Sequence, residues 1–175
     1  MPAWVRIMLL LGLGLILGML LVTAVIGRER LLTLIYGPIA FATIDFRTLQ
    51  RHARPNQYLV CPPHVCATTP DVGSPTYNIA ATVLRDAWLA MINQQPRVEG
   101  CAVSEDELQC DVVQRSRLLR FPDTITVRFI PLSPTTSTLA IYSRSHYGYS
   151  DFGVNRRRIE TWLASLRERV PMASH

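Results

Sequence analysis

Lysine is missing from this 175-residue chain, so every basic side chain is an arginine. A GC-rich genome is the simplest source of such a bias. The formal net charge of +5 still favours anionic partners, such as lipid head groups or envelope polymers, because opposite charges attract over the whole surface.

Several chemical signatures are also missing. The chain has neither G-x-S-x-G nor H-E-x-x-H, which mark serine hydrolases and zinc proteases. It contains no C-x-x-C redox pair, no C-x-x-C-H haem attachment motif and no recognised nucleic-acid-binding motif. We therefore expect no cofactor, no metal and no nucleic-acid partner.

Near the N-terminus, twenty consecutive uncharged residues run from Ile7 to Ile26 between Arg6 and Arg28. At the rise of a helix they span about 30 Å, the hydrocarbon thickness of a bilayer. A cleaved signal peptide is the alternative, but the segment is long and lacks a clear A-x-A exit. No cysteine follows directly, which excludes lipid attachment there. We expect one uncleaved transmembrane anchor within residues 1–30, which makes the membrane itself a partner.

The four cysteines, Cys61, Cys66, Cys101 and Cys110, all follow this segment. The arginines flanking the segment are nearly balanced and do not set its orientation. An even number of suitably spaced cysteines favours disulfides and an oxidising compartment. Cys61 and Cys66 would close a short loop. The expected localisation is the bacterial inner membrane, single-pass, with the C-terminal domain in the periplasm.

A turn over Ser104–Glu107 pairs Val103 with Leu108, and extending that ladder places Cys101 opposite Cys110. We therefore predict a second disulfide there. Zinc binding is the rival interpretation, but the cysteine spacings and the position of His64 suit it poorly. Thiol exchange by Cys61 and Cys66 is also not expected, because their spacing differs from that of a C-x-x-C motif.

Two segments alternate with the period of a β-strand, Thr124–Ile130 and Thr138–Ser145, and a Pro- and Ser-rich turn joins them. Ile125, Val127, Phe129, Leu139 and Ile141 make up their apolar faces. If those faces receive helices, Arg128, Tyr142 and Arg144 line the opposite face of the sheet.

Apolar residues recur at helical spacing from Asn78 to Pro96, and again from Val154 to Val170. Segments 97–103 and 107–118 read as the strands of the cysteine hairpin, and Asp45 as the cap of a short helix, Phe46–His52. The predicted fold class is α+β, with an antiparallel sheet of about four strands and two main helices packed on one face. Residues 31–56 form a juxtamembrane segment, 57–170 a single domain and 171–175 a tail.

The candidate ligand-binding residues lie on these strands and in the polar loop after them. They are Arg115, Arg117, Arg128, Tyr142, Arg144, His146, Asp151 and Asn155. Guanidinium groups suit carboxylate or phosphate ligands, since their donors form a planar fork. Asp151 or Asn155 would cap the last helix. The amide of Asn155 faces the apolar side of that helix, where it either tethers a loop or contacts a ligand.

Three stretches resemble a known family: DFRTLQRHARPNQYLVCPPHVC, RSRLLRFPD and SRSHYGYSDFGVNRRRIETWL. Over roughly Asp45–Leu166 the chain is similar to the domain of unknown function 1499 family. The resemblance implies a compact α+β domain, often behind an N-terminal membrane segment, and it implies no activity.

Two functions remain open. The first is a non-enzymatic, membrane-anchored envelope module that binds an anionic lipid, an envelope polymer or a membrane protein. The second is a hydrolase of cell-envelope material, with His146 as the base and Asp123 or Asp151 orienting it. The missing catalytic motifs favour the first.

Overall fold

The computed structural model describes residues 2–36 and 44–172, and the chain divides into two compact units, residues 1–40 and 41–175. In the first unit, helix α1 (Ala3–Ile26) is followed by helix α2 (Arg28–Tyr36). Helix α1 is long and apolar enough to cross a membrane, by length and composition. Part of the expected juxtamembrane segment is thus helical, and residues 37–43, which include its Pro38, lie outside the described residues.

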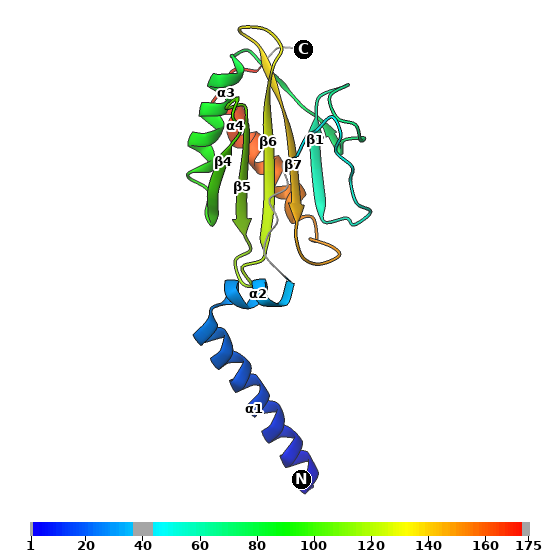
Figure 1. Ribbon diagram of the computed structural model, residues 1–175, viewed down its shortest axis with the longest axis vertical. Coiled ribbons are helices and arrows are strands. Elements are labelled where there is room, and N and C mark those ends of the chain that lie inside the picture. Colours follow the sequence, from blue (N-terminus) through cyan, green and yellow to red (C-terminus); the bar gives the residue numbers. More distant parts are fainter. Residues whose placement is uncertain (1, 37–43, 173–175) are drawn as a thin grey trace. The chain divides into compact units, whose positions relative to one another are not determined.

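The second unit is built on one sheet (Figure 1). Its strands are β1 (Gln57–Cys61), β2 (Val72–Gly73), β3 (Thr76–Tyr77), β4 (Val98–Val103), β5 (Gln109–Arg115), β6 (Pro122–Pro131) and β7 (Ser137–Ser145). They lie in the order β2-β1-β7-β6-β5-β4, and β3 also pairs with β7. The fold class is α+β as predicted, but the sheet has seven strands rather than about four.

Helices α3 (Ala81–Ile92) and α4 (Val154–Arg167) cover one face of the sheet. The alternating apolar residues of β6 and β7 point toward them, as predicted, and form the main core. Its buried members from these strands are Ile125, Val127, Phe129, Leu139 and Ile141. Trp88 of α3 contacts Trp162 of α4 edge to face, with ring centroids 5.8 Å apart.

The opposite face carries a second, smaller core, formed by residues from β1, β7 and the chain before β1. Phe46 and Leu49 are buried against Leu59 and Tyr142. Residues 44–56 therefore pack onto the sheet. The expected helix Phe46–His52 is wrong, since only Phe46–Thr48 form a turn.

Helix α3 begins three residues later than the sequence predicts. Strand β3 ends at Tyr77, which pairs with Ser137, so the chain just before Asn78 belongs to the sheet. The backbone amide of Asn78 donates to Pro171, and Met172 forms an isolated bridge with Tyr77. Part of the expected tail is thereby attached to the domain.

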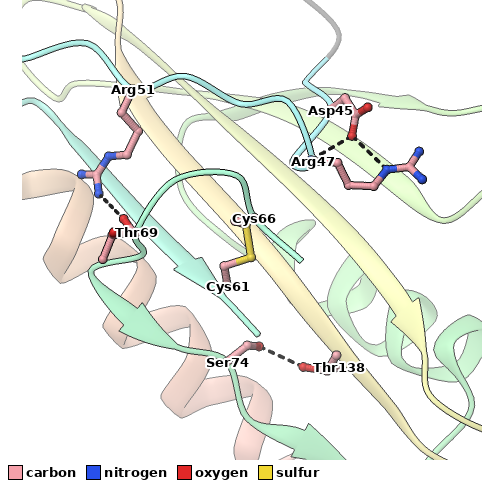
Figure 2. Close-up of a disulfide and its surroundings, with 8 residues drawn as sticks. All are labelled: Asp45, Arg47, Arg51, Cys61, Cys66, Thr69, Ser74 and Thr138. Carbon is pink, nitrogen blue, oxygen red and sulfur yellow. Dashed lines mark hydrogen bonds and ion pairs between the residues drawn. A yellow bond between two sulfur atoms is a disulfide. The ribbon is translucent and has the colours of Figure 1, made fainter. Parts of the chain in front are cut away.

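Cys61 and Cys66 form the predicted disulfide (Figure 2). It closes the loop after β1, and the chain beyond it returns to the sheet in β2, which pairs with β1. Ser74, directly after β2, accepts a hydrogen bond from Thr138 at 3.2 Å. On the other side of the loop, Arg51 donates to the carbonyl of Thr69 at 3.3 Å.

The second predicted disulfide is wrong: Cys101 is an exposed thiol and Cys110 a buried one. The predicted register fails as well, because Val103 pairs with Cys110 and Ala102 with Asp111. The turn sets this register, because the backbone amide of Ser104 donates to the carbonyl of Gln109. On the far side of these pairs, a bulge between Glu99 and Ala102, where Gly100 has a φ of +65°, shifts the ladder once more. Burial and the neighbouring Cys101 thiol raise the pKa of Cys110.

Candidate functional site

Tyr142 and Arg144 lie on the sheet face opposite α3 and α4, because alternate residues of strand β7 share a face. His146, the first residue after β7, joins them through Thr124. Arg144 pairs in register with Thr124 of β6. The hydroxyl of Thr124 is hydrogen-bonded to Nε2 of His146. This arrangement matches part of the predicted binding set.

The hydrogen bonding of Arg144, on this face, is incomplete. Its Nη1 is buried and has no acceptor among the described residues 2–36 and 44–172. Its Cζ lies 5.2 Å from the centroid of the Tyr142 ring, a cation–π contact. Burial lowers the pKa of Arg144, and nearby Tyr142 and Asp111 oppose that shift. A buried donor without a partner costs about 1–3 kcal/mol, so an anionic group at Arg144 would be stabilised.

Asp111 is the acidic residue whose charge acts on Arg144. Its carboxylate accepts a hydrogen bond from Thr126, the residue opposite it on β6. Burial raises the pKa of Asp111, which weakens it as a counter-charge for Arg144. In the part of the chain that the structure describes, no ion pair joins the two side chains.

His146 does not have the setting that the hydrolase hypothesis needs. Burial and the charge of Arg144 lower its pKa, and Asp123 partly opposes them. The carboxylate of Asp123 is engaged by Arg158 in a buried ion pair. Asp151 accepts hydrogen bonds from the backbone amides of Gly153 and Asn155 and so holds the start of α4. The hydrogen-bond partner of His146 is a threonine hydroxyl rather than a carboxylate.

The other predicted arginines do not join Arg144 in one surface. Both terminal nitrogens of Arg128 contact the carboxylate of Asp106, in the turn between β4 and β5. Arg115 is paired with Glu99 at 2.8 Å. Arg117 is exposed in the turn after β5. The four candidate arginines therefore do not form one binding surface, because carboxylates distant in sequence neutralise two of them.

Asn155 is a tether. Its side chain is fully buried, and its Oδ1 accepts hydrogen bonds from Ser143 and Arg158. Its Nδ2 lies 3.1 Å from the carbonyl oxygen of Asn56. Together these contacts fix the start of α4 to β7 and to the chain before β1. Sequence periodicity placed Asn155 on the apolar side of the helix, but Arg158 one turn later was missed.

A cleft of about 640 Å³ opens beside the start of β1 and was not predicted from the sequence. Its charged lining includes Arg51, Arg54, Arg156, Asp71, Asp151 and Glu160. Arg51 is paired with Asp71 at 2.9 Å, and Arg156 with Glu160 at 2.8 Å. Because its charges largely compensate one another, the cleft is a weaker anion site than Arg144. A further cavity of about 750 Å³ lies between residues 44–47 and the β4–β5 turn.

Within residues 2–36 and 44–172, no three His, Cys, Asp or Glu side chains are grouped so that they would hold a metal ion.

Comparison with known proteins identifies the family. No curated protein matches the chain. Two similar solved structures are a START superfamily protein from Mycobacterium smegmatis and the Zhui aromatase/cyclase from Streptomyces sp. R1128. The first is 14% identical, covers 55% of this chain and 93% of its own, and has a TM-score of 0.33. The second is 12% identical, covers 55% and 82%, and has a TM-score of 0.24. A family model described as protein of unknown function (DUF1499) matches residues 49–166. This match spans more than half of the chain, which therefore belongs to the DUF1499 family.

Proposed function

We propose that this protein is a non-enzymatic binding module, anchored in the inner membrane by α1, whose periplasmic domain recognises an anionic group at Arg144. The observation that carries the proposal is the buried Nη1 of Arg144, which lacks an acceptor among the described residues. A guanidinium held over a tyrosine ring keeps its planar donors oriented for a carboxylate or phosphate.

The compartment is proposed from two features of the chain. Helix α1 has the length and composition of a membrane span. The Cys61–Cys66 disulfide follows it and favours an oxidising environment. A domain placed in the periplasm would meet anionic lipids, envelope polymers and membrane proteins.

The chemical setting favours binding over catalysis. The guanidinium of Arg144 is a fixed positive charge beside the aromatic ring of Tyr142, and the imidazole of His146 is already hydrogen-bonded to Thr124. A charged ligand at a partly buried guanidinium gains more than at the protein surface, because water and salt screen the charge less there.

The test compares the full chain with two single variants in zwitterionic nanodiscs, with glycerol 1-phosphate and acetate as the phosphate and carboxylate probes. Arg144→Gln removes the incompletely bonded guanidinium. Arg128→Gln removes one that Asp106 already neutralises, so it is the matched control. We expect calorimetry to show binding to wild type and to Arg128→Gln, weakening as salt rises, and a loss of at least tenfold in Arg144→Gln.

Two results would overturn the proposal. Equal binding by wild type and Arg144→Gln would place the ligand elsewhere. If neither probe binds wild type, Arg144 has no anion-binding role of this chemistry.

A further inference from the structure

Two loops at one end of the sheet expose large apolar side chains. The first is the turn between β5 and β6, residues 116–121, and the second is the loop between β7 and α4, residues 146–153. Strand register places them together, because Arg115 pairs with Pro122 and Asp123 with Ser145. Figure 1 shows both at the same end of the sheet. We call Leu118, Leu119, Tyr149 and Phe152 the apolar tip.

The members of the apolar tip are exposed to an unusual degree. Leu118 is 74% exposed, Leu119 57%, Tyr149 72% and Phe152 87%. A single exposed leucine is ordinary on a protein surface, whereas four large apolar side chains gathered on adjoining loops mark an interaction site. Phe121 and Tyr147 link the loops through an edge-to-face contact of 5.9 Å between ring centroids. This contact holds the two loops of the apolar tip against each other.

The charge around the apolar tip is positive. Segments 115–121 and 146–157 contain five arginines and one acidic residue, Asp151, and Glu160 on the next turn of α4 pairs with Arg156. The carboxylate of Asp151 is turned toward the backbone at the start of α4. Glu99 is the acidic partner of both Arg115 and Arg120, so it offsets only one of the two charges. Exposed apolar side chains surrounded by cations match the surface of an anionic bilayer, where rings and leucines enter the interface and arginines meet the head groups.

We propose that the apolar tip docks on the surface of an anionic phospholipid bilayer. Helix α1, residues 3–26, is long and apolar enough to cross a membrane, and such an anchor would hold the domain near the bilayer surface. The effective concentration of the apolar tip at that surface is then high, so that even a weak affinity is sufficient for docking. This docking surface uses other side chains than the Arg144 site: the apolar tip is formed by loop residues, and Arg144 lies within strand β7.

Depth-dependent quenching of tryptophan fluorescence tests the proposal on the full chain in proteoliposomes of phosphatidylglycerol and brominated phosphatidylcholine. Trp4 lies in α1 and is first changed to Phe, which leaves the buried Trp88 and Trp162. Leu118→Trp then reports from the tip. Leu132→Trp is the matched control, because Leu132 is an exposed leucine in the β6–β7 turn at the opposite end of the sheet.

We expect brominated lipid to quench most of the emission added by Leu118→Trp and to leave that of Leu132→Trp unchanged. The quenching should weaken at high salt and when phosphatidylglycerol is replaced by phosphatidylcholine. It should also fall when Phe152→Ser is added, because the two loops insert together.

Equal quenching of the two reporters would overturn the proposal. So would protection of the tip by a second copy or another protein, seen as a blue-shifted Leu118→Trp emission that brominated lipid does not quench. Quenching that is indifferent to Phe152→Ser would overturn the two-loop surface. None of these outcomes depends on anion binding at Arg144.

Discussion

Arg158 of α4 and Asp123 of β6 form an ion pair whose side chains are only 6% and 9% exposed. The same guanidinium reaches Gln114 of β5 and Ser143 of β7. One helical residue therefore connects three neighbouring strands at the end of the sheet near the apolar tip. Its charge is buried and satisfied, so removing a single partner leaves an uncompensated group in the interior.

We predict that Arg158→Met or Asp123→Asn lowers the free energy of unfolding by about 3–5 kcal/mol, the usual cost of breaking one side of a buried pair. Urea denaturation of the full chain in detergent measures this. Arg156→Met is the control: its pair with Glu160 is exposed on the same helix and contributes about 0–1 kcal/mol. Similar losses for Arg158→Met and Arg156→Met would contradict the structural assignment.

The thiol state gives a second prediction. Alkylation of unreduced, unfolded protein should modify two cysteines, Cys101 and Cys110, and leave Cys61 and Cys66 joined. In the folded protein Cys101 should react well before Cys110, since it is exposed. Opening the disulfide by Cys66→Ser should cost about 2 kcal/mol, as expected for so short a loop. Mass spectrometry that finds Cys101 linked to Cys110 would contradict the assignment of both as free thiols.

Orientation in the membrane is tested by reporter fusion. With the N-terminus in the cytoplasm and the domain in the periplasm, an enzyme that is active only in the periplasm should be active when fused after His175. A fusion that works only with a cytoplasmic reporter would reverse the proposed topology. The disulfide would then need another explanation.

The pH dependence of stability provides a fourth prediction, at His146. The pKa of this histidine in the folded state is lowered from its usual value of 6.5 by burial and by Arg144. Below pH 6.5 the imidazole of His146 is protonated in the unfolded chain but stays neutral in the folded chain. The free energy of unfolding therefore decreases as the pH falls. Above pH 6.5 the contribution is fully present.

We expect His146→Gln to flatten the decline of the unfolding free energy below pH 6.5. Denaturant titrations of the full chain at several pH values measure the slope. His64→Asn, at an exposed position in the disulfide loop, is the control and should keep the wild-type slope. An unchanged slope in His146→Gln would show that this imidazole is not shielded from protonation.

Sequence patterns predicted the parts of the fold that depend on local order. The alternation in Thr124–Ile130 and Thr138–Ser145 assigned both faces of β6 and β7 correctly, because the period of a strand fixes which side chains share a face. The position of Asn155 on the apolar side of α4 followed from helical periodicity in the same way, and the tether was one of the two roles expected for it. Strands β1 to β3 were missed, because they are short, lie among prolines and pair with residues far along the chain.

The candidate site was predicted only in part, since charge partners cannot be read from one sequence. Arg128 and Arg144 occupy the same face and carry the same charge. What separates them is Asp106, which a turn brings to Arg128 and not to Arg144. The predicted pairing of Cys101 with Cys110 failed because the turn closes between Ser104 and Gln109, which moves the register by two residues. The bulge at Gly100 adds a further shift beyond those pairs.

The bulge in β4 also affects the exposed edge of the sheet. Strand β4 is the outermost strand, and all of its residues after Val98 are exposed, which makes it a template onto which another chain could add hydrogen bonds. The irregular step between Glu99 and Ala102 breaks the straight row of donors and acceptors that such an addition needs. At the opposite edge, β2 is only two residues long. Both margins of the sheet thus discourage edge-to-edge polymerisation, and copies of this domain can be concentrated without their sheets joining.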